Sequence, residues 1–206
     1  MTHGAAHAQK PPNVGPGELA RLPAYCPVSQ SFAEGGFPQG PLPSQQPWVA
    51  RMGPGFWAVH HYCWALINAG RAEAPGVARA AREHLLRRAI DDVNYVLRNS
   101  PADFVLAPEL LLRNGDYHEK LGLPVQAMEF YEMSRRSKPD YWPAYTRLAA
   151  LQARLGKREV ARQVLDEGLA VLPNHPELTA AKSALTQTGG SPRPTANKPS
   201  ASPAVK

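Results

Sequence analysis

The chain has 206 residues, 43% of them hydrophobic, which suffices for one domain with tails. No apolar run reaches the roughly 18 residues that span a bilayer, so the sequence predicts no membrane-spanning helix. The formal net charge of +6 is not gathered into a dense basic block, so nucleic-acid binding is not expected.

The N-terminal part of the chain is rich in proline, since nine of the 22 prolines lie in residues 1–50. Residues 1–8 end in Ala-His-Ala, which is either the remnant of a signal-peptidase site or a chance match, because no apolar stretch precedes it. Residues 9–54 are expected to form an extended arm without periodic helix. Six apolar residues would anchor this arm on the helices: Leu22, Tyr25, Cys26, Phe32, Phe37 and Trp48.

Residues 55–186 are where a helical domain can form. The first predicted helix covers 56–69, and Gly70 is its turn. A second helix would end before Pro101, with an inner face made by Ala89, Val93 and Val96. The distance from Gly70 to Pro101 exceeds the later spacing by 14 residues. This second helix is therefore long or preceded by a loop.

The sharpest local pattern is FWAVHHYCW in residues 56–64, which holds one of the two cysteines. A disulfide between Cys26 and Cys63 is favoured, because the cysteine count is even and an export signal would imply an oxidising compartment. Three alternatives stay open: a buried free Cys63, a Cys-His nucleophile pair, and a metal site. The candidate metal ligands are Cys26, His60, His61 and Cys63.

The C-terminal half of the domain repeats with a fixed period, because Pro139 and Pro173 lie 34 positions apart and the residues before them match at the same offsets. The matched pairs are Gly122 with Gly156, Ala127 with Ala161, Tyr131 with Leu165, and Ser134 with Gly168. Each glycine is expected to form the turn between two helices. A helix over 177–186 would cap the array, and residues 187–206 are expected to form a disordered tail.

This register resembles that of the tetratricopeptide repeat superfamily. The resemblance implies an all-α fold: a short right-handed solenoid of about three antiparallel helix pairs plus a C-terminal capping helix. The units would cover about 56–101, 108–141 and 142–175, with the cap at 176–186. In the last unit, Tyr145, Leu148 and Ala149 stand where the family motif has Trp, Leu and Gly.

The resemblance also implies a binding groove, because in this family the first helix of each pair lines one. Carried onto this sequence, the groove residues are Trp57, His60, Trp64, Asn68, Leu112, Asp116, Lys120, Thr146 and Arg154. One branch of the family grips a C-terminal carboxylate with Lys and Asn. That clamp is not expected here, because His60, Leu112 and Thr146 occupy one set of its positions. Alternatively, Trp57 and Trp64 pack under the N-terminal arm.

Together these features predict a non-catalytic scaffold that binds a peptide or a partner protein within an envelope-associated assembly. No Gly-rich phosphate loop, paired-carboxylate signature or nucleophile elbow indicates an enzyme, and no cofactor is expected. The predicted location is periplasmic or extracellular, with the cytoplasm as the alternative. The second predicted function is a metal-binding protein that uses the Cys/His cluster.

Overall fold

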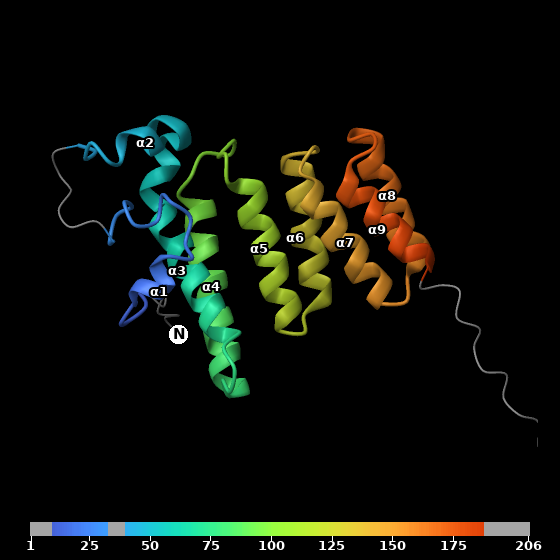
Figure 1. The fold of residues 1–206 in the computed structure, drawn as a ribbon, viewed down its shortest axis with the longest axis horizontal. Helices are drawn as coiled ribbons and strands as arrows, with labels where there is room; N and C mark the ends of the chain where they lie inside the picture. Colours follow the sequence, from blue (N-terminus) through green and yellow to red (C-terminus); the bar gives the residue numbers. More distant parts are fainter. Residues whose placement is uncertain (1–9, 33–39, 188–206) are drawn as a thin grey trace, which may run out of the picture.

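The computed structural model describes residues 10–32 and 40–187, and every regular element in them is helical (Figure 1). The N-terminal part contains α1 (Pro16–Leu19), α2 (Gln46–Met52) and the 3₁₀ helix η1 (Gly53–Ala58). The longer helices that follow are α3 (Val59–Ala72), α4 (Arg79–Arg98), α5 (Ala107–Lys120), α6 (Pro124–Ser137), α7 (Trp142–Arg154), α8 (Arg158–Val171) and α9 (Pro176–Gln187). None of the helices in this part of the chain is long and apolar enough to cross a membrane. The expected signal remnant and residues 188–206 of the expected tail lie outside the described residues.

The longer helices stack as antiparallel pairs, one beside the next (Figure 1). α3 packs on α4, α5 on α6 and α7 on α8, while α9 packs against both α7 and α8. α4 also contacts α5, and α6 contacts α7, so each pair covers an apolar face of its neighbour. The predicted all-α solenoid of three helix pairs and a capping helix is confirmed over the described residues.

The second and third pairs follow the 34-residue period in their turns and in their cores. Gly122 (φ 74°) and Gly156 (φ 79°) take left-handed backbone, which residues with a Cβ rarely adopt, in the short turns between their helices. The matched residues of the second helices are all buried: Ala127, Tyr131, Ser134, Ala161, Leu165 and Gly168. The spacing in the sequence therefore reflects which side chains face the paired helix.

In the first pair, the predicted helix boundaries are wrong. The residues before α3 wind as η1 and place Gly55 against Phe104, so closely that a Cβ on Gly55 would lie 2.4 Å from the Phe104 ring. Helix α3 consequently begins at Val59 rather than at residue 56, and Gly70 lies inside it instead of at the turn. The left-handed glycine of the following loop is Gly76 (φ 79°). α4 is 20 residues long, so the extra length is shared between this loop and the helix.

The N-terminal arm covers a face of α3 that no preceding helix pair covers. The predicted disulfide between Cys26 and Cys63 is confirmed, and both cysteines are fully buried. Beside it, the Ser29 hydroxyl donates to the carbonyl oxygen of Cys26 at 2.8 Å. The rings of Tyr25 and Trp48 meet edge to face, with centroids 5.7 Å apart. The arm thus caps the N-terminal end of the solenoid, as α9 caps the other end.

The sequence predicts an arm that is extended throughout. This prediction is wrong, because α2 forms within the arm. Pro47 stands in the first turn of α2, where its missing N–H removes no helical hydrogen bond. The buried Gln45 accepts a hydrogen bond from the Leu42 N–H (3.0 Å) and donates one to the Val28 carbonyl oxygen (2.9 Å). Of the predicted anchors, Tyr25 and Cys26 are buried, Leu22, Phe32 and Trp48 are partly buried, and Phe37 lies outside the described residues.

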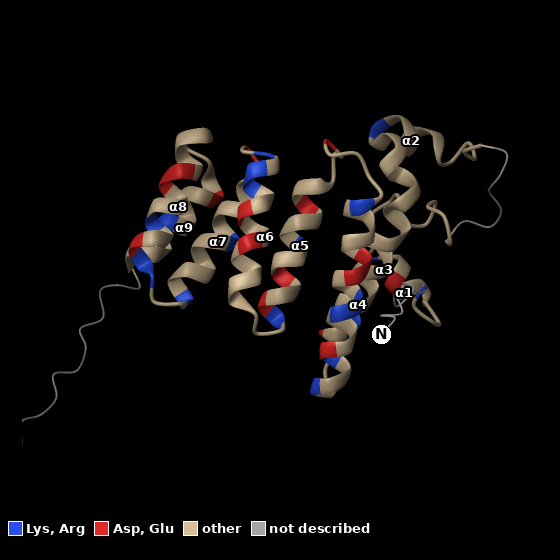
Figure 2. Ribbon diagram, turned by 180° about the vertical axis from the view of Figure 1, so that it is seen from behind, with Lys and Arg blue, Asp and Glu red and all other residues tan. Residues whose placement is uncertain are grey.

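Residues of both charge signs are interspersed along the ribbons of α4, α6 and α8 in the view from behind (Figure 2). Many of them pair along their own helix, such as Arg79 with Glu83 at 2.8 Å on α4 and Arg162 with Asp166 at 3.0 Å on α8. Such exposed pairs contribute little to stability. Charged residues that pair in this way are typical of ordinary solvent-exposed helix faces.

One ion pair ties α1 to α3. Arg71 donates from Nε to Oε1 of Glu18 at 2.6 Å and from Nη2 to Oε2 at 2.9 Å. It also donates to the carbonyl oxygen of Pro12 at 2.9 Å. The hydrogen bond from Arg71 lowers the pKa of Glu18 from 4.5 to about 2.

Acid is therefore expected to loosen the start of the arm. Because the folded-state pKa of Glu18 lies below its ordinary value of 4.5, the pair stabilises the arm above about pH 4.5 and is lost as the pH falls toward about 2. The two side chains are 27% and 31% exposed, so solvent screening limits the effect. We expect about 1 kcal/mol, or about fivefold faster amide exchange in residues 13–20 once the intrinsic pH dependence is removed. Arg71→Gln should abolish this change, whereas a wild-type arm with pH-independent protection would contradict it.

Candidate functional site

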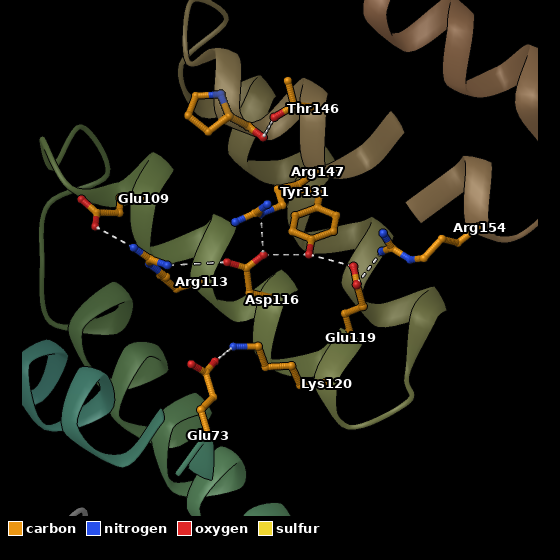
Figure 3. A network of polar contacts seen from close by, with 11 residues as sticks. Glu73, Glu109, Arg113, Asp116, Glu119, Lys120, Tyr131, Thr146, Arg147 and Arg154 are labelled. Atoms are coloured by element: carbon orange, nitrogen blue, oxygen red, sulfur yellow. Dashed lines mark hydrogen bonds and ion pairs between the residues drawn. The ribbon is translucent and has the colours of Figure 1, made fainter. Parts of the chain in front are cut away.

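An open pocket of about 420 Å³ lies between α5 and α7, the first helices of the second and third pairs. It is lined by Glu73, Arg113, Asp116, Glu119, Lys120, Arg147, Ala150 and Arg154. We call it the charged pocket, and Figure 3 shows its polar contacts from close by. Four cations and three carboxylates line it, which leaves a formal net charge of +1 (4 − 3).

Two of the three carboxylates, Asp116 and Glu119, are the more buried part of the charged pocket, whereas the side chain of Glu73 is 58% exposed. The side chain of Asp116 is 11% exposed and that of Glu119 is 31% exposed. The hydroxyl of the buried Tyr131, on α6, lies 2.9 Å from Oδ1 of Asp116 and 3.1 Å from Oε2 of Glu119, and it can donate its single proton to one of them at a time. Burial and the two carboxylates raise the pKa of Tyr131. Its hydroxyl therefore stays protonated at neutral pH and remains a donor to these acids.

The cations reach the charged pocket from α5 and α7 (Figure 3). Arg147 Nε lies 3.1 Å from Oδ1 of Asp116, and Arg113 Nη1 lies 3.7 Å from Oδ2 of the same carboxylate. Arg154 pairs with Glu119, and Lys120 pairs with Glu73. The four cationic side chains are 40–55% exposed. A molecule that approaches from solvent therefore meets N–H donors before it meets Asp116 and Glu119.

Three of the predicted groove residues line the charged pocket: Asp116, Lys120 and Arg154. The groove positions carried over from the family do not include Arg113 and Arg147, but the spacing of these residues in the sequence does indicate them. Arg113 and Arg147 are 34 positions apart, as are Lys120 and Arg154, and within each helix the two cations are seven apart. Residues seven apart share a helix face, so both pairs present the same two cations to the pocket. Glu73, from the loop after α3, has no such signal.

Two other predicted groove residues lie elsewhere. Leu112 is only 6% exposed and belongs to the hydrophobic core of the second and third pairs. Thr146 lines a neighbouring hollow between α7 and α9. Leu112 is therefore not available to a ligand, while Thr146 faces the neighbouring hollow rather than the charged pocket.

The predicted aromatic end of the groove is not an open surface. Three of its residues are buried: His60, Trp64 and Asn68. The long helix α4 covers them, because its Asp92 accepts a hydrogen bond from Asn68 (3.5 Å) and its Tyr95 stacks on His61, which in turn contacts Trp64. Trp57 is partly buried in η1 rather than placed on α3. The first pair therefore uses these side chains for packing.

The alternative metal site and the Cys-His nucleophile pair are wrong. Cys26 and Cys63 are joined to each other, so neither provides a thiolate. His60 Nδ1 lies 3.0 Å from the carbonyl oxygen of Trp57, and His61 Nδ1 lies 2.9 Å from Oδ1 of Asp92. Burial lowers the pKa of His60 to about 4, so its ring is neutral at neutral pH. In residues 10–32 and 40–187, no group of three or more His, Cys, Asp or Glu side chains is arranged to hold a metal ion.

Neither a protein-family model nor a curated protein matches this chain. Among solved structures, it is similar to TTC0263, a thermophilic tetratricopeptide repeat protein of Thermus thermophilus, with a TM-score of 0.55 at 17% identity over 70% of each chain. A match to the first such domain of Spaghetti (RPAP3), bound to the HSP90 peptide SRMEEVD, has a TM-score of 0.43 at 20% identity over 62% of this chain and 96% of the other. The Sgt2 domain from Aspergillus fumigatus matches with a TM-score of 0.44 at 19% identity over 65% and 90%.

The match to the Thermus protein confirms the tetratricopeptide-repeat fold for this chain. At this identity the likeness extends to the fold alone, and a fold of this kind hosts many different partners. What the chain binds must therefore be argued from its own side chains.

Proposed function

We propose that this protein is a non-catalytic interaction scaffold whose charged pocket binds an acidic segment of a protein partner. The observation that carries the proposal is that two of the acids, Asp116 and Glu119, are more buried than the four cations around them. Asp116 and Glu119 are held by Tyr131, while Arg147 and Arg154 extend over them from α7. An approaching carboxylate is thereby attracted by the cations without direct contact with the buried acids.

The cations of the pocket can replace their present carboxylate contacts by contacts to a ligand at little cost in free energy. The ion pair of Lys120 with Glu73 is exposed, and pairs of this kind are weak. A guanidinium carries five N–H donors, so Arg113 and Arg147 can hold Asp116 and still donate to a ligand. Arginine–carboxylate contacts can be bidentate, which adds direction to the attraction. The predicted groove residues Asp116, Lys120 and Arg154 would act here as the binding surface.

The chemistry of the pocket favours recognition over catalysis. The pKa of Tyr131 is raised, which moves this hydroxyl further from the range where it could exchange protons at neutral pH. The acids beside it are engaged with Arg113, Arg147 and Arg154. These side chains therefore support the role of a scaffold within a larger assembly.

The disulfide supports a place of action in an oxidising compartment, periplasmic or extracellular, and we propose the envelope-associated assembly as the setting there. The bond is fully buried and joins the arm to the first helix pair, so the folded protein is expected to carry it as a permanent part. Alkylation of the natural protein before and after reduction tests this. Two thiols that react before reduction would instead favour the cytoplasm.

Reversing two charges should abolish most of the peptide binding. Arg147→Glu with Arg154→Glu changes two exposed side chains, each 55% accessible, so the fold should persist. We expect the affinity for a peptide with four Glu residues to fall by at least about tenfold, and more at low salt. Fluorescence anisotropy with the full chain measures this.

The matched control reverses two cations outside the pocket, Arg136→Glu on α6 and Arg162→Glu on α8, which are 77% and 46% exposed. It makes the same change in net charge and should leave the affinity within about twofold. Peptides with Gln or Lys in place of Glu should bind weakly to every variant. Equal losses of affinity in both double variants would mean that overall charge determines peptide binding. That result would contradict a site at the charged pocket.

A further inference from the structure

A second open hollow, of about 340 Å³, lies between α7 and the capping helix α9. Its walls include Thr146, Ala149, Ala150 and Ala153 on α7 and Ala181 and Leu185 on α9, and no charged side chain lines it. We call it the apolar pocket. It exists because both helices present small side chains where they face each other, so their backbones enclose space that larger residues would fill.

The apolar pocket and the charged pocket flank a single helix. Arg147, Ala150 and Arg154 line the charged pocket, while Ala149, Ala150 and Ala153 line the apolar pocket. Ala150 belongs to both and is exposed, so it forms a low crest between them. A chain lying across α7 at Ala150 would therefore reach both pockets.

The walls of the apolar pocket are fixed in place. Leu178, near the start of α9, is fully buried in the core. Farther along α9, Lys182 pairs with Asp166 of α8 at 2.6 Å. At the end of α9, the Arg158 guanidinium donates to the carbonyl oxygen of Leu185. A ligand would thus enter a preformed hollow and would not have to order the capping helix.

We propose, building on the function proposed above, that the same acidic partner segment inserts one aliphatic side chain into the apolar pocket. Packed helices are about 8–10 Å apart, and an extended chain advances about 3.3 Å per residue. The partner is therefore an extended peptide with acidic residues over the charged pocket and a Val, Leu or Ile about three positions away. An acidic chain is the expected occupant because the apolar pocket adjoins the charged pocket. The cations of the charged pocket would draw such a chain across the crest at Ala150.

Two labelled peptides test this on the full chain by fluorescence anisotropy. Both carry four Glu residues, and they differ only in Leu or Ala three positions beyond the last Glu, with a second set in reversed order. In one of the two orders, the wild type should bind the Leu peptide about tenfold more tightly than the Ala peptide, as burial of an aliphatic side chain predicts. Ala153→Phe should fill the pocket and remove this preference while the Ala peptide still binds.

The matched control is Ala170→Phe, which adds the same ring at an exposed position of α8 and should keep the preference. If Ala153→Phe does not fold, the comparison of the two peptides on the wild type decides alone. Equal affinities for Leu and Ala peptides, both lost in the Arg147→Glu/Arg154→Glu variant, would overturn this inference and leave the proposed function standing. No binding of any acidic peptide would overturn both. Self-association that Ala153→Phe abolishes, without a peptide preference, would make a second copy the occupant and overturn the inference.

Discussion

Replacing Cys26 and Cys63 by alanine is expected to lower the free energy of unfolding by about 4 kcal/mol. The two residues are 37 positions apart, so the bond restricts the unfolded chain over that whole loop. In the folded protein both side chains are fully buried between the arm and α3. Without the disulfide, only noncovalent contacts hold the arm on the helices. One of these contacts, the Arg71–Glu18 pair, is partly exposed.

The midpoint of thermal unfolding, followed by circular dichroism, should fall by about 8–16 °C. Limited proteolysis should cleave the released arm first, since local opening follows the least stable part of the structure. Wild-type protein treated with a reductant in mild denaturant serves as the control and should reproduce the variant. An unchanged midpoint in both samples would show that the arm does not support the first helix pair.

Gly115→Leu is expected to destabilise the second helix pair by about 3 kcal/mol. A Cβ at Gly115 would lie 2.3 Å from Cε1 of Tyr131, a ring that is itself fully buried between α5 and α6. Either the helices separate or the ring moves, and both lose packing. The measurement is the midpoint of urea unfolding.

Gly70→Leu is the matched control, because Gly70 also lies within a helix but has no heavy atom within 4 Å of the position of a Cβ. That change should be neutral or slightly stabilising, since glycine is a poor helix former. Gly115→Leu should also weaken peptide binding, because a displaced Tyr131 no longer donates to Asp116 and Glu119. Equal stability of the two leucine variants would contradict the close packing at Gly115.

The regular part of the fold could be predicted because its period is a property of neighbouring residues along the chain. Gly122 and Gly156 mark turns, and the small residues before Pro139 and Pro173 mark the buried helix faces. The first pair could not be placed in the same way. Its register depends on the contact between Gly55 and Phe104, which are far apart in sequence.

The charged pocket was predictable in part for the same reason. Asp116, Lys120 and Arg154 follow from the repeat register, and the 34-residue period also relates Arg113 to Arg147. The aromatic residues of the first pair were misplaced, because their burial depends on Asp92 and Tyr95 of the unusually long α4. No local pattern near Trp64 or Asn68 indicates that contact. Helix α2 was missed because the hydrogen bonds of Gln45 to Leu42 and Val28 offset a proline-rich composition.

The position of a bound acidic peptide on the protein tests the proposed function most directly. Amide resonances of the full, isotope-labelled chain can be followed while the peptide with four Glu residues is added. Binding at the charged pocket predicts that the largest shifts fall in α5 from Arg113 to Lys120 and in α7 from Arg147 to Arg154, with little change in α1 and α2. Saturable shifts centred on any other helices, or no shifts at all, would contradict the charged pocket as the binding site.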